Sequence, residues 1–127
     1  MKKIYLICNL HSGKTIINFP LSKIIDMFTK ADFEVTVHPT QFRGDASISA
    51  KYACESEFDL IVCCGGDGTL NEVISGCIKA NAPLPIGYIP TGSTNDFARS
   101  LGIPKNAMDA VDAIINGKAE KCDIGKI

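Results

Sequence analysis

One carboxylate stands among three glycines at the point where an apolar run gives way to a helical pattern. In the stretch VCCGGDGTLNEV, Asp67 is flanked by Gly65, Gly66 and Gly68. Glycine loses more conformational freedom on folding than any other residue, so three glycines together indicate that this turn needs a bare backbone. A phosphate group can approach such a backbone, where the N–H groups and positive dipole end of the following helix would bind it.

The carboxylate itself needs an explanation, because it repels phosphate. Asp67 fits such a site if Mg²⁺ lies between the two groups, or if the carboxylate takes a proton from an attacking hydroxyl. It is therefore our candidate catalytic residue and metal ligand. We also predict an anion-binding nest of successive N–H groups, and a capping box of Thr69 and Glu72 that fixes the helix start. The alternative is that GGDG is only a tight turn with an exposed aspartate.

A second polar segment is rich in residues that could donate hydrogen bonds to a nucleotide. The stretch PTGSTNDFARSLGIP, residues 90–104, places six small polar residues directly before a predicted helix. They are Thr91, Gly92, Ser93, Thr94, Asn95 and Asp96. One of them must cap the helix, but six exceed what one cap requires. Their hydroxyl and amide groups would suit the phosphates or ribose of a nucleotide.

Composition limits the class of protein. The chain has 127 residues, which is one domain, and its formal net charge of -1 argues against a nucleic-acid partner. No stretch approaches the roughly 20 apolar residues of a membrane helix. The six cysteines show no metal-like spacing, so we expect buried thiols in a cytoplasmic protein. His11 and His38 show no partner for acid–base or metal chemistry.

Strand and helix patterns alternate along the chain, as a parallel sheet requires. We expect strands at 3–9, 33–40, 59–64, 84–90 and 118–127, and helices at 15–31, 44–57, 69–80, 95–103 and 104–117. Pro20 should lie in the first turn of its helix, and Asp45 is the expected cap of the next one. The fold class predicted is α/β, a three-layer α/β/α arrangement with a mainly parallel sheet.

This architecture brings the polar segments together. Ligands bind outside the carboxyl ends of the strands in such sheets. The segments 9–14, 40–44, 65–69 and 91–96 each follow one of the predicted strands. We therefore expect four loops to converge on one rim of the sheet.

The two long motifs together resemble the catalytic domain of the diacylglycerol kinase family, which includes sphingosine kinases, ceramide kinases and bacterial lipid kinases. The opening NLHSGK resembles the family's Asn-Pro-x-Ser-Gly segment, with Leu10 in place of proline but Asn9, Ser12 and Gly13 retained. Thr40 stands ahead of Gly-Asp-Ala, where the family has a nucleotide-contacting threonine. The CDIG of the tail resembles the strand that leads out of the nucleotide domain. The resemblance covers essentially the whole chain.

The resemblance implies ATP- and Mg²⁺-dependent phosphorylation of a lipid hydroxyl, on a nucleotide domain like that of NAD kinases and phosphofructokinases. Residues 1–127 would form the N-terminal nucleotide-binding domain, and a β-rich domain that carries the lipid site would follow. Asp67 would serve the Mg²⁺ network or act as base. The expected nucleotide contacts are Asn9, Ser12, Gly13, Thr40, Gly65, Gly66, Asp67, Gly68, Thr69, Leu70, Asn71, Glu72, Thr91, Gly92, Ser93, Asn95 and Asp96.

Two alternatives stay open at this point. One is a kinase of a soluble substrate, like NAD kinase, which shares a GGDG turn. The other is a non-catalytic nucleotide-binding module. For the partners we expect ATP and a diacylglycerol-like lipid at a membrane surface, with a homodimer as an open alternative. Peripheral membrane contact is implied only by the resemblance. Lys14 and Arg99 are weaker candidates for phosphate contact.

Overall fold

The computed structural model describes residues 2–9, 20–90 and 107–116. The predicted helix at 95–103 and the predicted strand at 118–127 lie outside the described residues. So do the start of the helix predicted at 15–31, the segment 91–96 and Cys122.

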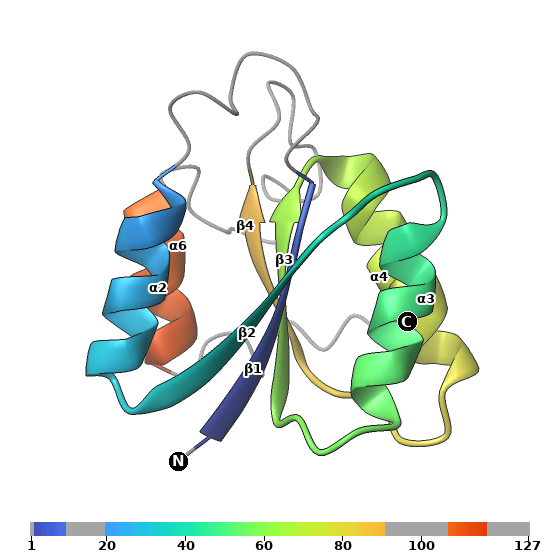
Figure 1. The fold of residues 1–127 in the computed structure, drawn as a ribbon, viewed down its shortest axis with the longest axis horizontal. Helices are drawn as coiled ribbons and strands as arrows, with labels where there is room; N and C mark the ends of the chain where they lie inside the picture. Colours follow the sequence, from blue (N-terminus) through green and yellow to red (C-terminus); the bar gives the residue numbers. More distant parts are fainter. Residues whose placement is uncertain (1, 10–19, 91–106, 117–127) are drawn as a thin grey trace.

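Four parallel strands form the sheet (Figure 1). They are β1 (Lys2–Cys8), β2 (Phe33–Pro39), β3 (Leu60–Gly65) and β4 (Ile86–Pro90). Their spatial order is β2-β1-β3-β4, so the chain places β2 on one side of β1 and then β3 and β4 on the other. A ligand crevice is expected where this order reverses, between the carboxyl ends of β1 and β3.

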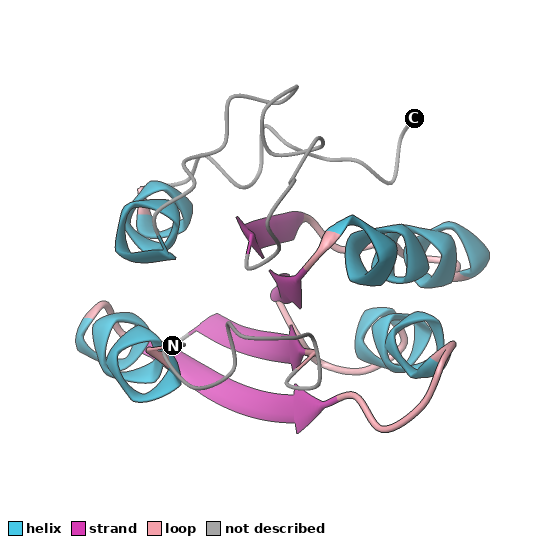
Figure 2. Cartoon of the chain, turned by 90° about the horizontal axis from the view of Figure 1, so that it is seen from above, coloured by secondary structure: helices cyan, strands magenta, loops and turns pink. Residues whose placement is uncertain are grey.

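Helices cover both faces of the sheet, which confirms the predicted α/β fold class and its three layers (Figure 2). On one face lie α2 (Leu21–Lys30) and α6 (Ala107–Ile115), and on the other α3 (Asp45–Cys54) and α4 (Asp67–Lys79). Each face has its own apolar cluster. In the part of the chain that the structure describes, no helix has the length and apolar character to cross a membrane.

The apolar patterns account for these elements. All six residues of β3 are buried, because the strand is covered by helices on both faces. On α2, Ile24 and Phe28 lie one turn apart and are both fully buried. Pro20 is the residue before that helix rather than part of its first turn, and its carbonyl accepts the N–H of Ile24. Pro20 therefore lies one residue before the helix.

The five described cysteines are buried thiols, as the sequence predicted. Burial raises the pKa of Cys63 and Cys64 far above the ordinary range, so neither is a thiolate at neutral pH. Both belong to the apolar clusters of the sheet. They act as small core residues.

A glycine sets how closely α3 and α4 pack. A Cβ atom on Gly76 would overlap the carbonyl oxygen of Ser47 and lie 3.0 Å from the Cβ of Ala50. We expect Gly76→Ala to lower the free energy of unfolding by about 1–3 kcal/mol through overpacking. Urea unfolding of this variant and of Ser75→Ala, on the same helix, would measure it. Equal stability of the two variants would contradict this packing account.

Candidate functional site

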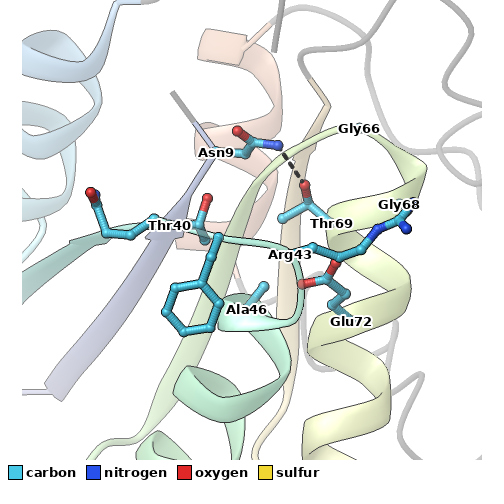
Figure 3. Close-up of a pocket in the computed structure, with 10 residues that line it drawn as sticks. Asn9, Thr40, Arg43, Ala46, Gly66, Gly68, Thr69 and Glu72 are labelled. Carbon is cyan, nitrogen blue, oxygen red and sulfur yellow. Dashed lines mark hydrogen bonds between the residues drawn. The ribbon is translucent and has the colours of Figure 1, made fainter. Parts of the chain in front are cut away.

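A pocket of about 450 Å³ lies at the carboxyl ends of β1, β2 and β3, within the size range of small-molecule sites (Figure 3). It occupies the position where the strand order reverses. Its lining comes from Asn9, Thr40, Gln41, Phe42, Arg43, Ala46, Gly66, Gly68, Thr69 and Glu72. Three of the four loops predicted to converge therefore meet here. The fourth, 91–96, lies outside the described residues.

The sheet fixes the first two of these residues through their backbones. The N–H of Asn9 donates to the carbonyl of Cys64 on β3 at 2.9 Å. The N–H of Thr40 donates to the carbonyl of Cys8 on β1 at 2.8 Å. Each bond continues the sheet one residue past a strand end, so both side chains are held at the rim.

The glycine turn connects β3 directly to α4. α4 begins at Asp67, two residues earlier than predicted, and Gly66 precedes it with φ -91° and ψ -174°. Gly44 is the only glycine of the described residues with positive φ, so the glycine turn has no left-handed residue of the kind that a nest with alternating backbone conformations contains. The N–H groups at the turn are instead those of a helix start, at Gly68 and Thr69, which have no acceptor within the helix.

The three glycines of this turn have different reasons to be glycine. A Cβ on Gly65 would lie 2.9 Å from the side chain of Thr69, so internal packing excludes it. A Cβ on Gly66 or on Gly68 would meet no atom within 4 Å. Neither has a positive φ, so the described chain itself does not require glycine at these two positions. Both line the pocket, so the described part of the chain leaves the space over these two glycines open.

The predicted capping box is wrong. No side chain caps α4. The Thr69 hydroxyl instead accepts a hydrogen bond from the Asn9 side chain at 3.2 Å, shown as the dashed line in Figure 3. The Glu72 carboxylate accepts the N–H of Gly44 at 3.1 Å. Both side chains therefore tie α4 to the neighbouring loops rather than to its own first turn.

Asp45 also differs from its predicted role, because it does not cap α3. Its carboxylate is buried and accepts the N–H of Gln41 at 2.7 Å and the Ser49 hydroxyl at 3.1 Å. His38 Nε2 lies 3.1 Å from both of its oxygens, so this histidine does have a partner that the sequence did not reveal. Burial works to raise the pKa of Asp45, but the bonds from Gln41, His38 and Ser49 outweigh it and lower that pKa. This network holds the β2–α3 loop of the pocket.

The lowered pKa gives a pH prediction for the loop. The Asp45 network contributes stability above the ordinary pKa of 3.8 and loses it as the pH falls through the lowered folded-state value. We expect Asp45→Asn to lower the free energy of unfolding by about 1–3 kcal/mol at pH 7. The difference from the unmodified protein should shrink near pH 3. Urea unfolding at the two pH values measures it, and an equal difference at both would contradict the assignment.

Asp67 is held from the neighbouring strand. The hydroxyl of Tyr88, on β4, lies 3.3 Å from Oδ1 of Asp67 and 3.2 Å from the carbonyl oxygen of Gly65. The tyrosine is 2% exposed, whereas Asp67 is half-buried at the start of α4. The carboxylate is therefore anchored at one oxygen beside the turn.

One positive charge borders the pocket. Arg43 is the basic residue among the described lining residues, and none of the described carboxylates forms an ion pair with it. In Figure 3 its side chain extends from the β2–α3 loop toward the Gly68 end of α4. A guanidinium and a helix start that face the same space both favour an anion there.

Comparison with known proteins identifies the family. The model of the diacylglycerol kinase catalytic domain matches residues 3–127. The chain belongs to this family.

Curated relatives and solved structures agree. A diacylglycerol kinase of Bacillus subtilis is 44% identical over 100% of the chain and 42% of its own length. One from Staphylococcus carnosus is 40% identical over 99% of the chain and 41% of its own length. The crystal structure of a diacylglycerol kinase from Bacillus anthracis superposes with a TM-score of 0.81, at 32% identity, over 91% of this chain and 42% of that one. The chain thus spans about two fifths of the length of the relatives it matches.

The pocket of this family member gathers part of the predicted site. Of the predicted residues, those that line it are Asn9, Thr40, Gly66, Gly68, Thr69 and Glu72. Gly65 and Asp67 lie beside it in the turn. Leu70 does not line it, because its side chain is buried in the core and its N–H donates to the carbonyl of Gly66. Asn71 is exposed and does not line it either. Outside the described residues lie Ser12, Gly13, Thr91, Gly92, Ser93, Asn95 and Asp96.

Sequence reasoning missed two groups at the site. Phe42 and Arg43 belong to the polar loop that was predicted to reach the rim, but no motif distinguished them from its other members. Tyr88 lies in a predicted strand, 84–90, to which the sequence assigned no site residue. Its one signal was a phenol in a buried strand, since a buried tyrosine hydroxyl needs a partner.

Proposed function

We propose that the chain is the nucleotide-binding part of an ATP- and Mg²⁺-dependent lipid kinase that transfers the γ-phosphoryl group to a lipid hydroxyl of the diacylglycerol type. The observation that carries the proposal is the pair of pocket-facing glycines, Gly66 and Gly68, at which a side chain would meet no atom of the described chain. Family membership supports the reaction class.

The phosphates of ATP would lie over the start of α4. The N–H groups of Gly68 and Thr69 would donate to phosphate oxygens, and Arg43, whose side chain extends toward Gly68, would add a positive charge. Asn9 and Thr40, held at the rim by their backbone bonds, would contact the rest of the nucleotide. The remaining donors would come from the segment 91–96.

The donor set fits Mg²⁺ held mostly by the nucleotide. Among the described residues, no group of three or more acidic, histidine or cysteine side chains could hold a metal by itself. Mg²⁺ usually takes one or two carboxylates and completes its shell with phosphates and water, so Asp67 alone suffices as the contribution of the described residues. When bound, the ion would neutralise charge on the transferring phosphoryl group. Asp67 would orient that arrangement or take the proton of the lipid hydroxyl.

The lipid site would belong to a second, β-rich domain, because the relatives are more than twice as long as this chain. Family membership favours a lipid hydroxyl over the soluble acceptor of an NAD kinase-like enzyme. The protein would act in the cytoplasm at a membrane surface. We also propose that the protein forms a homodimer. Measurement of its molecular mass in solution would test this.

Arg43 gives a direct test of the nucleotide site. We expect Arg43→Ala to weaken binding of Mg·ATP to the complete protein about 10-fold, through loss of one charge-assisted contact to phosphate. Isothermal titration calorimetry measures the affinity, with Lys79→Ala as a control that removes a positive charge from the other end of α4. If Arg43→Ala binds Mg·ATP with unchanged affinity, or if both variants lose the same affinity, then Arg43 does not contact the nucleotide.

A further inference from the structure

A buried hydroxyl supports the one carboxylate on which the proposed chemistry depends. Tyr88 is 2% exposed in the apolar cluster between the sheet and α4. A phenylalanine would fill nearly the same volume, so packing alone does not require the hydroxyl. A buried hydroxyl without a partner costs free energy, and this one finds its partners in the glycine turn.

The position of Tyr88 in the sheet explains how its hydroxyl comes to lie beside the glycine turn. Tyr88 pairs with Cys63 in the parallel register of β3 and β4, two residues before Gly65 pairs with Pro90. Cys63 and Tyr88 belong to the same apolar cluster, on the face that α4 covers. From there the phenol oxygen comes within 3.2 Å of the Gly65 carbonyl and 3.3 Å of Asp67 Oδ1.

We propose that Tyr88 is a positioning residue for phosphoryl transfer, whose hydroxyl fixes the Asp67 carboxylate against the start of α4. This inference rests on the proposed function. A carboxylate is planar, so a bond at one oxygen also limits where the other oxygen can point. Tyr88 has one O–H, which Gly65 and Asp67 share, and it therefore links the backbone of the turn to the side chain that acts there.

The hydroxyl stays a donor across the physiological range. Burial raises the pKa of Tyr88 far above its ordinary value of 10.0, and the nearby Cys63 and Asp67 raise it further. Tyr88 donates to Asp67 from a fixed place in β4. Its contribution is the geometry of Asp67, which should affect the chemical step more than nucleotide binding.

The experiment compares Tyr88→Phe with the unmodified complete protein, using Mg·ATP and diacylglycerol vesicles. We expect kcat to fall about 10-fold, the equivalent of one hydrogen bond to a charged group, with KM for ATP changed less than about twofold. Tyr52→Phe is the control, since it removes the same hydroxyl from an exposed tyrosine of α3. Its kcat should stay unchanged.

A second readout does not depend on turnover. Calorimetric titration of ATP at several Mg²⁺ concentrations gives the gain in affinity that the metal confers. We expect this gain to fall by less than about twofold in Tyr88→Phe and by more in Asp67→Asn. The double variant should show no further loss beyond Asp67→Asn, because Tyr88 acts through Asp67.

Three outcomes would overturn the inference. The first is a kcat equal to that of the unmodified protein. The second is a loss of activity that matches a loss of folded protein in thermal unfolding. The third is a double variant, Tyr88→Phe with Asp67→Asn, in which the losses of the two single variants add. None of these three outcomes would contradict the proposed function. An unmodified protein that neither binds Mg·ATP nor transfers phosphate would contradict both the proposed function and this inference.

Discussion

Asp67→Asn is expected to lower the rate of phosphoryl transfer by the complete protein about 1,000-fold while the fold stays intact. The amide has nearly the same shape as the carboxylate but carries no negative charge and cannot accept a proton as a base. It can still accept a hydrogen bond from the buried hydroxyl of Tyr88, so the packing beneath the turn is retained. Steady-state kinetics with labelled ATP measure the rate, and thermal unfolding checks the fold.

The control for this variant is Asp26→Asn. Asp26 lies on the exposed side of α2 and pairs with Lys30 on the next helical turn, where an ion pair contributes little. Its rate should equal that of the unmodified protein. Turnover by Asp67→Asn within a few-fold of the unmodified rate would show that Asp67 is neither the base nor part of the metal network.

Gly68→Asp is expected to weaken ATP binding at least about 100-fold. The new carboxylate would stand at the start of α4, where the phosphates are proposed to bind, and would repel them. Because a Cβ at Gly68 meets no atom within 4 Å, the substitution should leave the fold intact, and the loss can be assigned to the ligand. Calorimetric titration of Mg·ATP measures the affinity.

Asn81→Asp is the matched control, since it adds the same charge just beyond the far end of α4 at an exposed position. It should bind ATP like the unmodified protein. Gly68→Ala should lie between the two, because it adds the Cβ without the charge. Normal affinity in Gly68→Asp would mean that phosphate does not lie over this helix start, and that another reason must account for the two open glycines.

The arrangement of the fold could be predicted from local pattern. The apolar run of β3 is typical of a strand covered on both faces, and the alternation of strand and helix leaves few topologies. From these followed the convergence of Asn9, the β2–α3 loop and the glycine turn at one end of the sheet. Topology decides that convergence, so the identity of single side chains hardly affects it.

The contacts between elements could not be predicted in this way. Asp45 and Glu72 have residue types that favour caps, and both instead bind backbone N–H groups of the β2–α3 loop. A cap contributes about 1 kcal/mol, which a buried bond to another element easily exceeds. Tyr88 reaches Asp67 only through the register of β3 and β4, which no pattern within either strand reveals.

The three glycines of the turn show both what the sequence could predict and what it could not. Their spacing in the sequence predicted a bare backbone, but gave the same reason for all three. The structure separates Gly65, which internal packing requires, from Gly66 and Gly68, which open onto the pocket. Only the positions of neighbouring side chains could make that distinction.

The most direct test of the proposed function is transfer of labelled phosphate from ATP to lipid by the complete protein. The panel would hold diacylglycerol, sphingosine, ceramide and phosphatidylglycerol in vesicles with Mg²⁺. We predict a labelled product from diacylglycerol that disappears in Asp67→Asn and in Gly68→Asp but persists in Asp26→Asn and Asn81→Asp. No labelled lipid from any of the four, in a sample that binds Mg·ATP, would contradict the assignment of this chain to a lipid kinase.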